Sequence, residues 1–303
     1  MTYIMKITRD NTVFRVYKSL NASGEEIARK LGISRTAVWK AIEKLREWNY
    51  VIESRKGVGY TIISKPDISP FEVADVAFKN LKELVEEVWY YTEVDSTNQR
   101  AREYGKPNTL FFAEKQTLGR GRMGRKWFSE RGGLYFSLTL KPRLSIEDIP
   151  KLTLTTGLAV AKSIPNAKVK WPNDVLINGK KVCGILCELI GEVEQPIVVV
   201  GIGINVKNPI PKELEDKATN LSLNLIDVFD YVTKNLYRYY SKLFIGKWKD
   251  IRREYIENCE TIGKFVKVKT LSKVYEGLAK GIDDDGALII NRERVYAGEC
   301  FYI

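Results

Sequence analysis

The segment from Gln116 to Glu130, QTLGRGRMGRKWFSE, constrains the fold most, because it separates two apolar stretches while offering almost no side chain to a core. Between Gly119 and Lys126 it holds four Lys or Arg residues, three Gly residues and no acidic residue. Glycine lets backbone N–H groups approach an anion closely, and arginine donates paired hydrogen bonds to it. The segment predicts a flexible basic loop that closes over an anionic ligand, with a plain exposed basic loop as the alternative.

The glycine spacing of this loop matches two known phosphate-binding motifs, but the other residues that each motif requires are absent. The dinucleotide fingerprint GxGxxG must open a helix and requires an acidic residue about twenty positions further on. Here the run LYFSLTL over 134–140 predicts a strand instead, and position 139 is Thr. The Walker A motif needs Lys followed by Ser or Thr, whereas this chain has Arg125-Lys126. The loop is therefore predicted to join two strands, the first over 110–115.

The composition excludes several classes of protein. A chain of 303 residues with 44% hydrophobic content is long enough for two or three globular units. It has no long apolar run and no secretory leader, so we expect a cytoplasmic protein. The absence of histidine removes Ser-His and Cys-His catalytic pairs and most zinc sites. Four scattered cysteines predict reduced core thiols rather than disulfides or a metal site: Cys183, Cys187, Cys259 and Cys300.

The first fifth of the chain is strongly basic. Residues 1–65 contain 13 Lys or Arg and 6 Asp or Glu, so +7 of the net charge of +11 lies there. Such an imbalance indicates an acidic polymer as the partner of this part of the chain.

The same region carries the pattern of a winged helix-turn-helix. Over 24–43, Gly32 permits the tight turn and Ser34 can cap the second helix. The alternation over 51–63 around a basic, glycine-rich tip predicts a hairpin, or wing. A three-helix module that contacts only protein is the alternative. The residues expected to meet DNA are Arg35, Thr36, Trp39, Lys40, Arg55 and Lys56.

Beyond a linker at 64–70, strands and helices are predicted to alternate in a second unit. Helices are expected over 71–88, 96–104, 151–164 and 227–259, and strands over 89–92, 110–115, 134–140, 168–171, 175–177, 182–190 and 197–204. The region from 262 onward alternates throughout and predicts a small all-β unit.

Three features of the second unit indicate ligand binding. The run DSTN at 95–98 offers side-chain oxygens at the start of a short helix, where they either cap the helix or also hold a polar ligand. Lys170 lies in an apolar corner formed by Val, Trp and Pro, which is unusual for a solvent-exposed lysine. The apolar strand over 197–204 contains Gly201 and Gly203, and glycine in a central strand marks close approach of backbone or ligand.

Together these segments resemble the bifunctional biotin protein ligases that also repress biotin operons. The resemblance is carried by SGEEIARKLGISRTAVWKAIEKLREW, KGVGYTI, EVDSTNQ, QTLGRGRMGRKWFS, KWPNDVLING, GILCE, GIGINV and GKFVKVKT with YEGLAKGIDDDGALII, and it covers nearly the whole chain. It implies an α+β multidomain fold with a winged helix-turn-helix over 1–65, a catalytic domain over 70–259 and an SH3-like β-barrel over 260–303. The catalytic domain would be a central mixed β-sheet with flanking helices, similar to class II synthetases.

The resemblance also implies the reaction and its partners. Biotin and ATP, with Mg²⁺ as the counter-ion and no tightly bound metal, would give biotinyl-5′-adenylate and pyrophosphate. Biotin would then pass to one lysine of a biotin carboxyl carrier domain of a carboxylase. Operator DNA is the second implied partner, and a homodimer is implied once the adenylate is bound.

Residue roles follow from the same resemblance. The implied catalytic residues are Lys170 and Arg122, and Asp174 or solvent is the candidate base for the transfer step. The implied biotin contacts are Ser96, Thr97, Asn98, Gln116, Arg120, Gly121, Arg122, Lys170 and Gly203. The implied ATP and adenylate contacts are Arg122, Arg125, Trp127, Lys170, Asn173 and Asn205. Met123 stands where some relatives carry a further basic residue, so the loop here is less positive.

Three other functions compete with this interpretation. A lipoate or octanoate ligase of the same fold would lack both the winged helix and the arginine loop. A ligand-sensing transcription regulator without catalysis would use the loop and Lys170 only for binding. A single-strand nucleic-acid binder would use the basic loop and the aromatic residues, but it gives the GIGIN strand and the KWPND corner no role.

Overall fold

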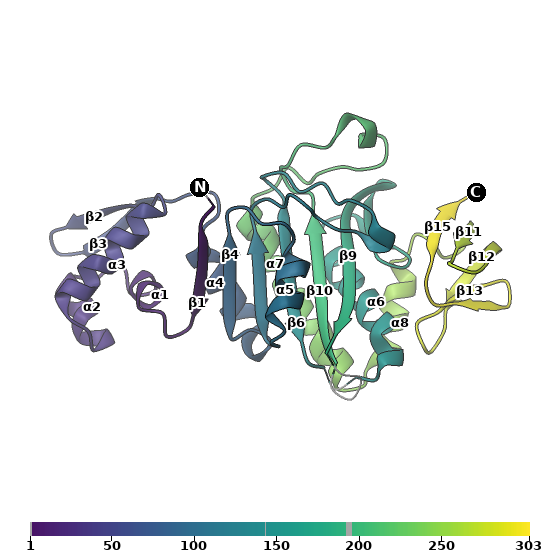
Figure 1. Cartoon of the computed structure of the whole chain (residues 1–303), viewed down its shortest axis with the longest axis horizontal. Coiled ribbons are helices and arrows are strands. Elements are labelled where there is room, and N and C mark those ends of the chain that lie inside the picture. The colour runs from purple at the N-terminus through teal and green to yellow at the C-terminus, as the bar shows by residue number, and fades with distance from the viewer. Residues whose placement is uncertain (1, 143, 192–195) are drawn as a thin grey trace.

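The computed structural model of this chain describes residues 2–142, 144–191 and 196–303, and three units follow one another along its longest axis (Figure 1). A helical unit with a hairpin lies at the N-terminal end. A large sheet with helices occupies the middle, and a small all-β unit lies at the C-terminal end.

The N-terminal unit has the predicted winged helix-turn-helix architecture. Ser23 and Glu26 form a reciprocal capping box at the start of the first helix of the motif. Gly32 ends that helix at a φ of 66°, and the Ser34 hydroxyl accepts a hydrogen bond from the N–H of Ala37. The elements are α1 (Thr12–Tyr17), α2 (Gly24–Leu31), α3 (Arg35–Glu47), β2 (Val51–Arg55) and β3 (Gly59–Ser64).

A strand before α1 was not expected from the sequence. Strand β1 (Ile4–Thr8) pairs antiparallel with β4 (Glu87–Tyr91) and becomes the edge of the central sheet. The guanidinium of Arg9 then donates hydrogen bonds to the carbonyl oxygens of Phe78 at 3.1 Å and Lys82 at 3.0 Å. The N-terminal unit is therefore joined to the middle of the molecule by sheet pairing as well as by the linker.

In the part of the chain that the structure describes, the central sheet has eight strands in the order β1-β4-β5-β6-β10-β9-β8-β7. Among the described residues, only the β4 and β5 pair is parallel, so the sheet is mixed, as expected. The nearly all-apolar strand β10 lies inside the sheet between β6 and β9, as its composition predicted. The remaining strands are β5 (Thr109–Ala113), β6 (Leu134–Leu140), β7 (Ala167–Lys170), β8 (Asp174–Ile177), β9 (Lys180–Ile190) and β10 (Ile197–Ile204).

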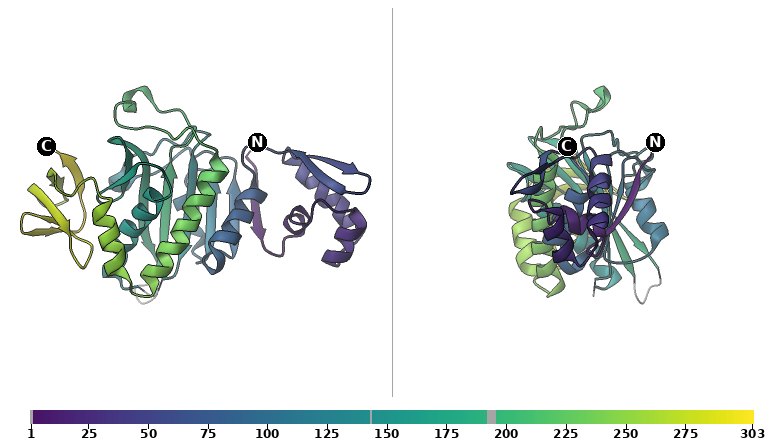
Figure 2. Two further views of the ribbon diagram at one scale, coloured as in Figure 1. Left: turned by 180° about the vertical axis from the view of Figure 1, so that it is seen from behind. Right: turned by 90° about the vertical axis from the view of Figure 1, so that its left-hand side faces the viewer.

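Helices cover both faces of this sheet unequally (Figure 2). One face carries α4 (Pro70–Asn80), α6 (Ile149–Ala161), which follows the short η3 (Ile146–Asp148), α7 (Leu225–Phe244) and α8 (Trp248–Glu257). The other face carries α5 (Thr97–Tyr104), which packs on β5, β6 and β10. Within the described residues, no helix combines the length and apolar character needed to cross a membrane.

Two predicted helices are shorter than expected. The helix predicted over 71–88 ends at Asn80, because Lys82 takes a φ of 51° and begins the short η1 (Lys82–Leu84) before β4. The helical stretch predicted over 227–259 is two helices, α7 and α8. They are separated at Gly246, whose φ of 78° is incompatible with a continuous helix.

The C-terminal unit is all-β, as predicted. Its five antiparallel strands are ordered β14-β13-β12-β11-β15, and within the described residues the two edge strands do not pair to close a barrel. The strands are β11 (Phe265–Lys269), β12 (Val274–Ile282), β13 (Leu288–Ile290), β14 (Glu293–Val295) and β15 (Glu299–Tyr302).

Candidate active site

A cavity of about 640 Å³ opens between the basic loop, the start of α5, strand β10 and the turn after β7, and strand β15 of the C-terminal unit forms part of its wall. Every residue that the sequence assigned to biotin or adenylate lines this cavity: Ser96, Thr97, Asn98, Gln116, Arg120, Gly121, Arg122, Arg125, Trp127, Lys170, Asn173, Gly203 and Asn205. Segments far apart in the sequence thus converge on one site.

One end of the cavity is a buried polar network at the start of α5. The Ser96 hydroxyl caps the helix by accepting a hydrogen bond from the N–H of Gln99. The N–H and hydroxyl of Thr97 donate to Oε1 of Gln116 at 2.8 and 3.1 Å. Ser137 Oγ lies 2.6 Å from Asn98 Oδ1. The residues at the start of α5 therefore both cap the helix and line the cavity. Their hydrogen bonds hold in place the donors and acceptors that a ligand would contact.

Ser137 was missed because it lies inside the apolar run of β6 and carries no local signal. The two glycines of β10 were identified correctly as points of close approach. A Cβ atom at Gly201 would lie 2.0 Å from Asn98 Oδ1, and one at Gly203 would lie 2.4 Å from Trp127 Nε1. Both glycines thus leave room for side chains of the site itself.

The basic loop is folded as a tight hydrogen-bonded hairpin. The N–H of Gly121 donates to the carbonyl of Arg125 at 2.7 Å, and the N–H of Trp127 donates to the carbonyl of Gly119 at 2.9 Å. A Cβ atom at Gly119 would lie 2.5 Å from the Trp127 carbonyl oxygen, so the close approach requires glycine. The tip, η2 (Arg122–Gly124), places Met123 at a φ of 55°.

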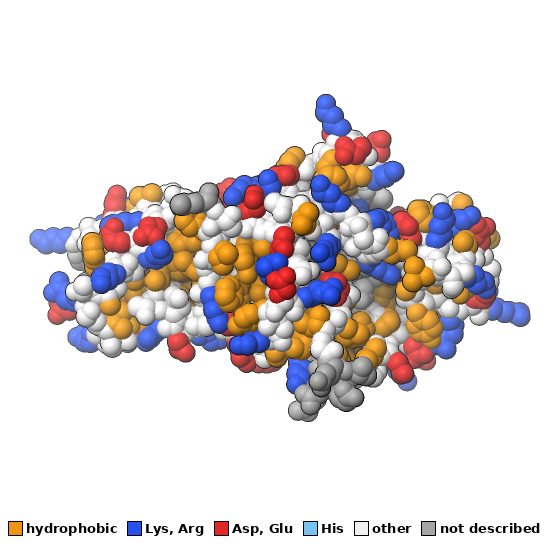
Figure 3. All heavy atoms as spheres, in the orientation of Figure 1, with side chains coloured by type: hydrophobic (Ala, Val, Ile, Leu, Met, Phe, Trp, Pro, Cys, Tyr) orange, Lys and Arg blue, Asp and Glu red, His pale blue; other side chains and the backbone are white. Residues whose placement is uncertain are grey.

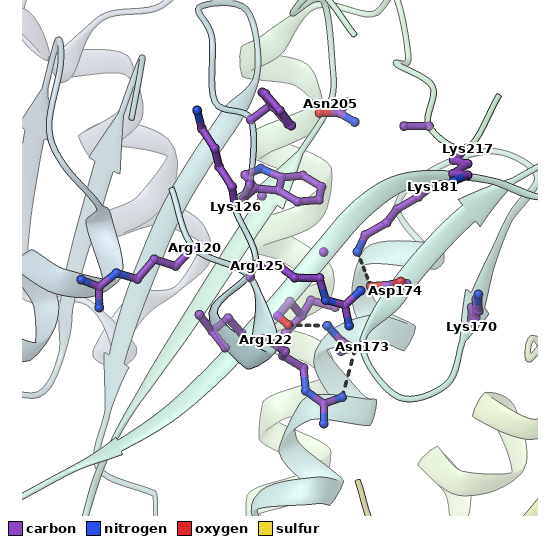
Figure 4. Close-up of a pocket in the computed structure, with 18 of the residues that line it drawn as sticks. Arg120, Arg122, Arg125, Lys126, Lys170, Asn173, Asp174, Lys181, Asn205 and Lys217 are labelled. Atoms are coloured by element: carbon purple, nitrogen blue, oxygen red, sulfur yellow. Dashed lines mark hydrogen bonds and ion pairs between the residues drawn. The ribbon is translucent and has the colours of Figure 1, made fainter. Parts of the chain in front are cut away.

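The arginines of the loop have different surroundings (Figure 4). Arg122 is half-buried and donates to Asn173 Oδ1 at 3.1 Å, and burial lowers the pKa of its guanidinium from the ordinary value. Arg125 forms an ion pair with Glu299 of β15 at 2.7 Å. Arg120 is exposed and points away from Asp174 and Asn173 in this conformation.

The lysines opposite the loop complete the cationic end of the cavity. Lys181 Nζ lies 2.6 Å from Asp174 Oδ1 and 5.3 Å from the centroid of the Trp127 ring (Figure 4). Lys170 is half-buried, and its Nζ lies 4.7 Å from the centroid of the Tyr302 ring. Of the described residues that line the cavity, seven are Lys or Arg and three are Asp or Glu. The cavity is therefore suited to anionic ligands.

Sequence reasoning missed several residues of this cavity. Lys181 and Lys217 reach it from β9 and from the long connection after β10, which includes η4 (Lys212–Leu214) and projects above the sheet in Figure 1. Residues 298–301 reach it from the C-terminal unit. None of these residues belongs to a recognisable motif, because their approach depends on tertiary packing alone.

The cysteines are free, and Cys183, Cys259 and Cys300 are buried, in agreement with the predicted core thiols. Cys300 lines the cavity, but burial raises the pKa of its thiol to about 11. At neutral pH it is therefore protonated and a poor nucleophile.

A second concave surface lies on the N-terminal unit between helix α3 and the β2–β3 hairpin. Five of the six predicted DNA contacts line it, and the sixth, Lys40, is exposed outside it. Trp39 is 53% exposed, which is unusual for a tryptophan that only packs. Basic side chains are visible at this end of the molecule in Figure 3. The residues that line the surface are Arg35, Thr36, Trp39, Arg55 and Lys56.

Comparison with known proteins agrees with this geometry. The sequence model of the Biotin/lipoate A/B protein ligase family matches residues 91–205. Two further family models, HTH domain and Biotin protein ligase C terminal domain, match residues 12–61 and 261–302, respectively. A relative from Bacillus subtilis, Bifunctional ligase/repressor BirA, is 37% identical over 289 residues, which cover 88% of each chain.

The chain belongs to the bifunctional biotin ligase/repressor family. The relative of the same name from Escherichia coli is 30% identical and covers 95% of each chain. The solved structure of the biotin protein ligase from Aquifex aeolicus in complex with biotin and ATP is 33% identical, with a TM-score of 0.64. It covers 71% of this chain and 98% of its own. The family predicted from the sequence is thereby confirmed, and neither the lipoate ligase nor the non-catalytic regulator is favoured.

Proposed function

We propose that this chain is a biotin protein ligase that joins biotin and ATP into biotinyl-5′-adenylate, transfers biotin to a lysine of a carboxyl carrier protein, and represses transcription through its winged helix. The observation that carries the ligase function is the two-ended cavity. Its polar end at α5 suits the neutral ring system of biotin, and its cationic end suits the carboxylate and the phosphates.

The first step needs positive charge more than it needs a base. The biotin carboxylate is already ionised at neutral pH, so no proton has to be removed before it attacks the α-phosphate. Two anions about 3.5 Å apart repel by roughly 5 kcal/mol at an effective dielectric near 20. Lys170, Arg122 and Lys181 lie on the cavity wall where they can offset this repulsion.

Closure over the intermediate is assigned to the loop and its tryptophan. Trp127 already packs against Gly203, and its buried Nε1 makes no hydrogen bond within the described residues. We assign this indole to the adenine ring, with Asn173 and Asn205 as polar contacts. A closed loop would also shield the mixed anhydride from water.

Mg²⁺ is proposed to arrive with ATP. Within the described residues, no group of three or more Cys, Asp or Glu side chains gathers to hold a metal ion. Of the cavity carboxylates, Asp174 is paired with Lys181 and Glu299 is paired with Arg125. The protein therefore supplies few free oxygens, and the phosphates themselves are the better ligands for Mg²⁺.

The second step needs a base, because the carrier lysine has an ordinary pKa of about 10.4 and attacks only when neutral. Asp174 lines the cavity beside Lys181 and is our candidate, with solvent as the alternative.

Repression is assigned to residues 1–65, with Arg35, Thr36, Trp39, Lys40, Arg55 and Lys56 facing operator DNA. A homodimer formed after adenylate binding would present two such units to two half-sites. We assign ligase chemistry to 70–259, and we propose that the sheet of 260–303 is an open form of the SH3-like barrel. The free thiols suit a reducing compartment such as the cytoplasm.

The test of the ligase function is biotin-dependent exchange between ATP and pyrophosphate. The unmodified chain should catalyse it and should label a carrier protein, whereas Lys170→Ala should lower the exchange rate by at least ~1000-fold while leaving the melting temperature unchanged, because transition-state charge stabilisation is lost. Lipoate offered in place of biotin serves as the control substrate. Exchange at the normal rate in Lys170→Ala would remove that residue from the mechanism.

The loop is tested separately with Arg122→Gly. This change removes the hydrogen bond to Asn173 and a cation from the cavity, so the variant should release adenylate and biotinylate bystander proteins roughly 10- to 100-fold faster. Streptavidin detection on a mixture of carrier and unrelated proteins measures this. A variant that still labels only the carrier would contradict the role given to the loop.

A further inference from the structure

Two of the cavity cations, Arg125 and Lys181, pair with carboxylates, whereas within the described residues Lys170 forms no ion pair. Its Nζ instead lies 4.7 Å from the ring centroid of Tyr302, a distance at which an ammonium group is attracted by the ring. Lysine has a flexible four-carbon stem, so without such a contact its ammonium group would sample many positions. Within the described residues, the ring of Tyr302 is therefore the contact that restrains the position of the Lys170 ammonium group.

Tyr302 is itself held firmly although it is the last residue of β15. Its backbone pairs with Val266 of β11, and its hydroxyl lies 3.3 Å from Thr261 Oγ1. That same hydroxyl oxygen of Thr261 accepts a hydrogen bond from the N–H of Trp171 at 3.0 Å. The residue that follows Lys170 and the ring that contacts Lys170 are thus tied to one threonine.

We propose that Tyr302 is a positioning residue for Lys170, and that through it the C-terminal unit orients the charge that brings biotin and ATP together. The inference rests on the proposed ligase function and on the role of Lys170 in it. Tyr302 does not line the cavity itself, so its effect must be transmitted through the lysine.

Two alternative roles for the Tyr302 ring are weaker. A second ammonium group, that of Lys264, lies 4.1 Å from the same ring, but it is already neutralised by Glu260 at 2.7 Å. Burial raises the pKa of the Tyr302 phenol above its ordinary value, so the phenol is neutral at physiological pH. An ion pair with a tyrosinate is thereby excluded, and the face of the ring is what Lys170 meets.

The test compares three variants of the full chain in biotin-dependent ATP–pyrophosphate exchange. Tyr302→Leu removes the ring and should lower kcat roughly 3- to 30-fold, the range of one partly buried cation–π contact, with a smaller change in the KM for biotin. Tyr302→Phe keeps the ring and should retain kcat within about twofold. Tyr275→Leu is the matched control, because Lys273 Nζ lies 4.6 Å from that ring on the same sheet, away from the cavity.

A double-variant cycle separates positioning from a merely structural role. Affinity for a stable sulfamoyl analogue of biotinyl-adenylate is measured with Lys170 present and with Lys170→Ala. If Tyr302 acts through the lysine, Tyr302→Leu weakens binding in the first background and changes nothing in the second. Equal weakening in both backgrounds would show that the ring supports the fold and not the charge.

Three further results would overturn the proposal. The first is a normal exchange rate in Tyr302→Leu. The second is an equal loss of exchange in Tyr302→Phe and Tyr302→Leu, because it would assign the effect to the hydroxyl group and not to the ring. The third is an equal loss of exchange in Tyr275→Leu, because it would mean that removing any aromatic ring from this sheet lowers the activity. Failure of the unmodified chain to catalyse exchange would instead reject the ligase function, so the two failures are distinguishable.

Discussion

The two accessory units are joined to the central sheet in different ways. The N-terminal junction is built from sheet pairing and aromatic packing: β1 extends the sheet beside β4, and the rings of Trp48 and Tyr90 meet edge to face at 5.7 Å. It also buries Glu72, which is 5% exposed and forms an ion pair with Lys65. No described residue of 2–65 lines the cavity.

The C-terminal junction, in contrast, reaches the cavity. Residues 298–301 line the cavity, Glu299 holds Arg125 of the loop, and Tyr302 contacts Lys170. The described residues of the N-terminal unit therefore contribute nothing to the lining of the cavity, whereas the C-terminal unit supplies part of its wall. Damage to the first junction should therefore spare catalysis, and damage to the second should not.

The substitution Gly298→Val tests the C-terminal junction and has the largest expected effect. Gly298 has a φ of 154°, and a Cβ atom there would lie 2.6 Å from Val268 Cγ1 and 2.9 Å from the Lys269 carbonyl oxygen. A valine would force β15 away from β11, at about 3 kcal/mol of overpacking and backbone strain, and exchange activity should fall roughly 100-fold. Retained activity with a displaced β15 would show that the C-terminal unit is dispensable.

The matched control on the other side is Gly59→Val. A Cβ atom at Gly59 would lie 2.0 Å from the backbone of Ala22, at a φ of 87°, so the wing should be displaced from the helix-turn-helix. Operator binding in a gel shift should be lost while exchange stays within about twofold of normal. A comparable loss of exchange here would mean that the N-terminal unit also communicates with the cavity.

These contrasts show what the sequence could and could not predict. The helix-turn-helix and the basic loop follow local rules, since capping residues and residues with positive φ act on their immediate neighbours. The glycines of β10 were also identified, because glycine is costly in a central strand unless something approaches closely. The resemblance to biotin ligases rested on these same segments.

The junctions could not be predicted, because they depend on pairing between distant segments. The segment of β1 is short and exposed at Ile4, and nothing in it specifies pairing with a strand about eighty residues away. Lys170 was identified as a lysine confined by apolar neighbours, but its aromatic partner lies at the other end of the chain. Lys181 and Lys217 have ordinary lysine surroundings in the sequence, and only the packed structure brings them to the cavity.

A third prediction concerns the N-terminal junction itself. Ile7 of β1 is 0% exposed and faces Val88 across the sheet. Ile7→Ala should lower the free energy of unfolding by about 2 kcal/mol, because it removes buried methyl groups and leaves a cavity. The kcat of exchange, measured well below the melting temperature, should remain unchanged. Chemical denaturation measures the change in the free energy of unfolding. A fall in kcat would contradict the claim that the N-terminal junction does not affect catalysis.

The smallest expected effect concerns the wing. Lys56 lies at the tip of the β2–β3 hairpin and lines the concave surface of the N-terminal unit, where we expect its single charge to meet a DNA phosphate. Lys56→Ala should weaken operator binding roughly 2- to 5-fold and lower the slope of log affinity against log salt by about one, because one phosphate contact is lost. Titrations at three salt concentrations measure the slope. Val58→Ala at the same hairpin tip is the control for loss of side-chain volume without loss of a cation. If Lys56→Ala lowered affinity equally at all salt concentrations, the wing would not contact phosphate, and the basic face would have to act through protein contacts instead.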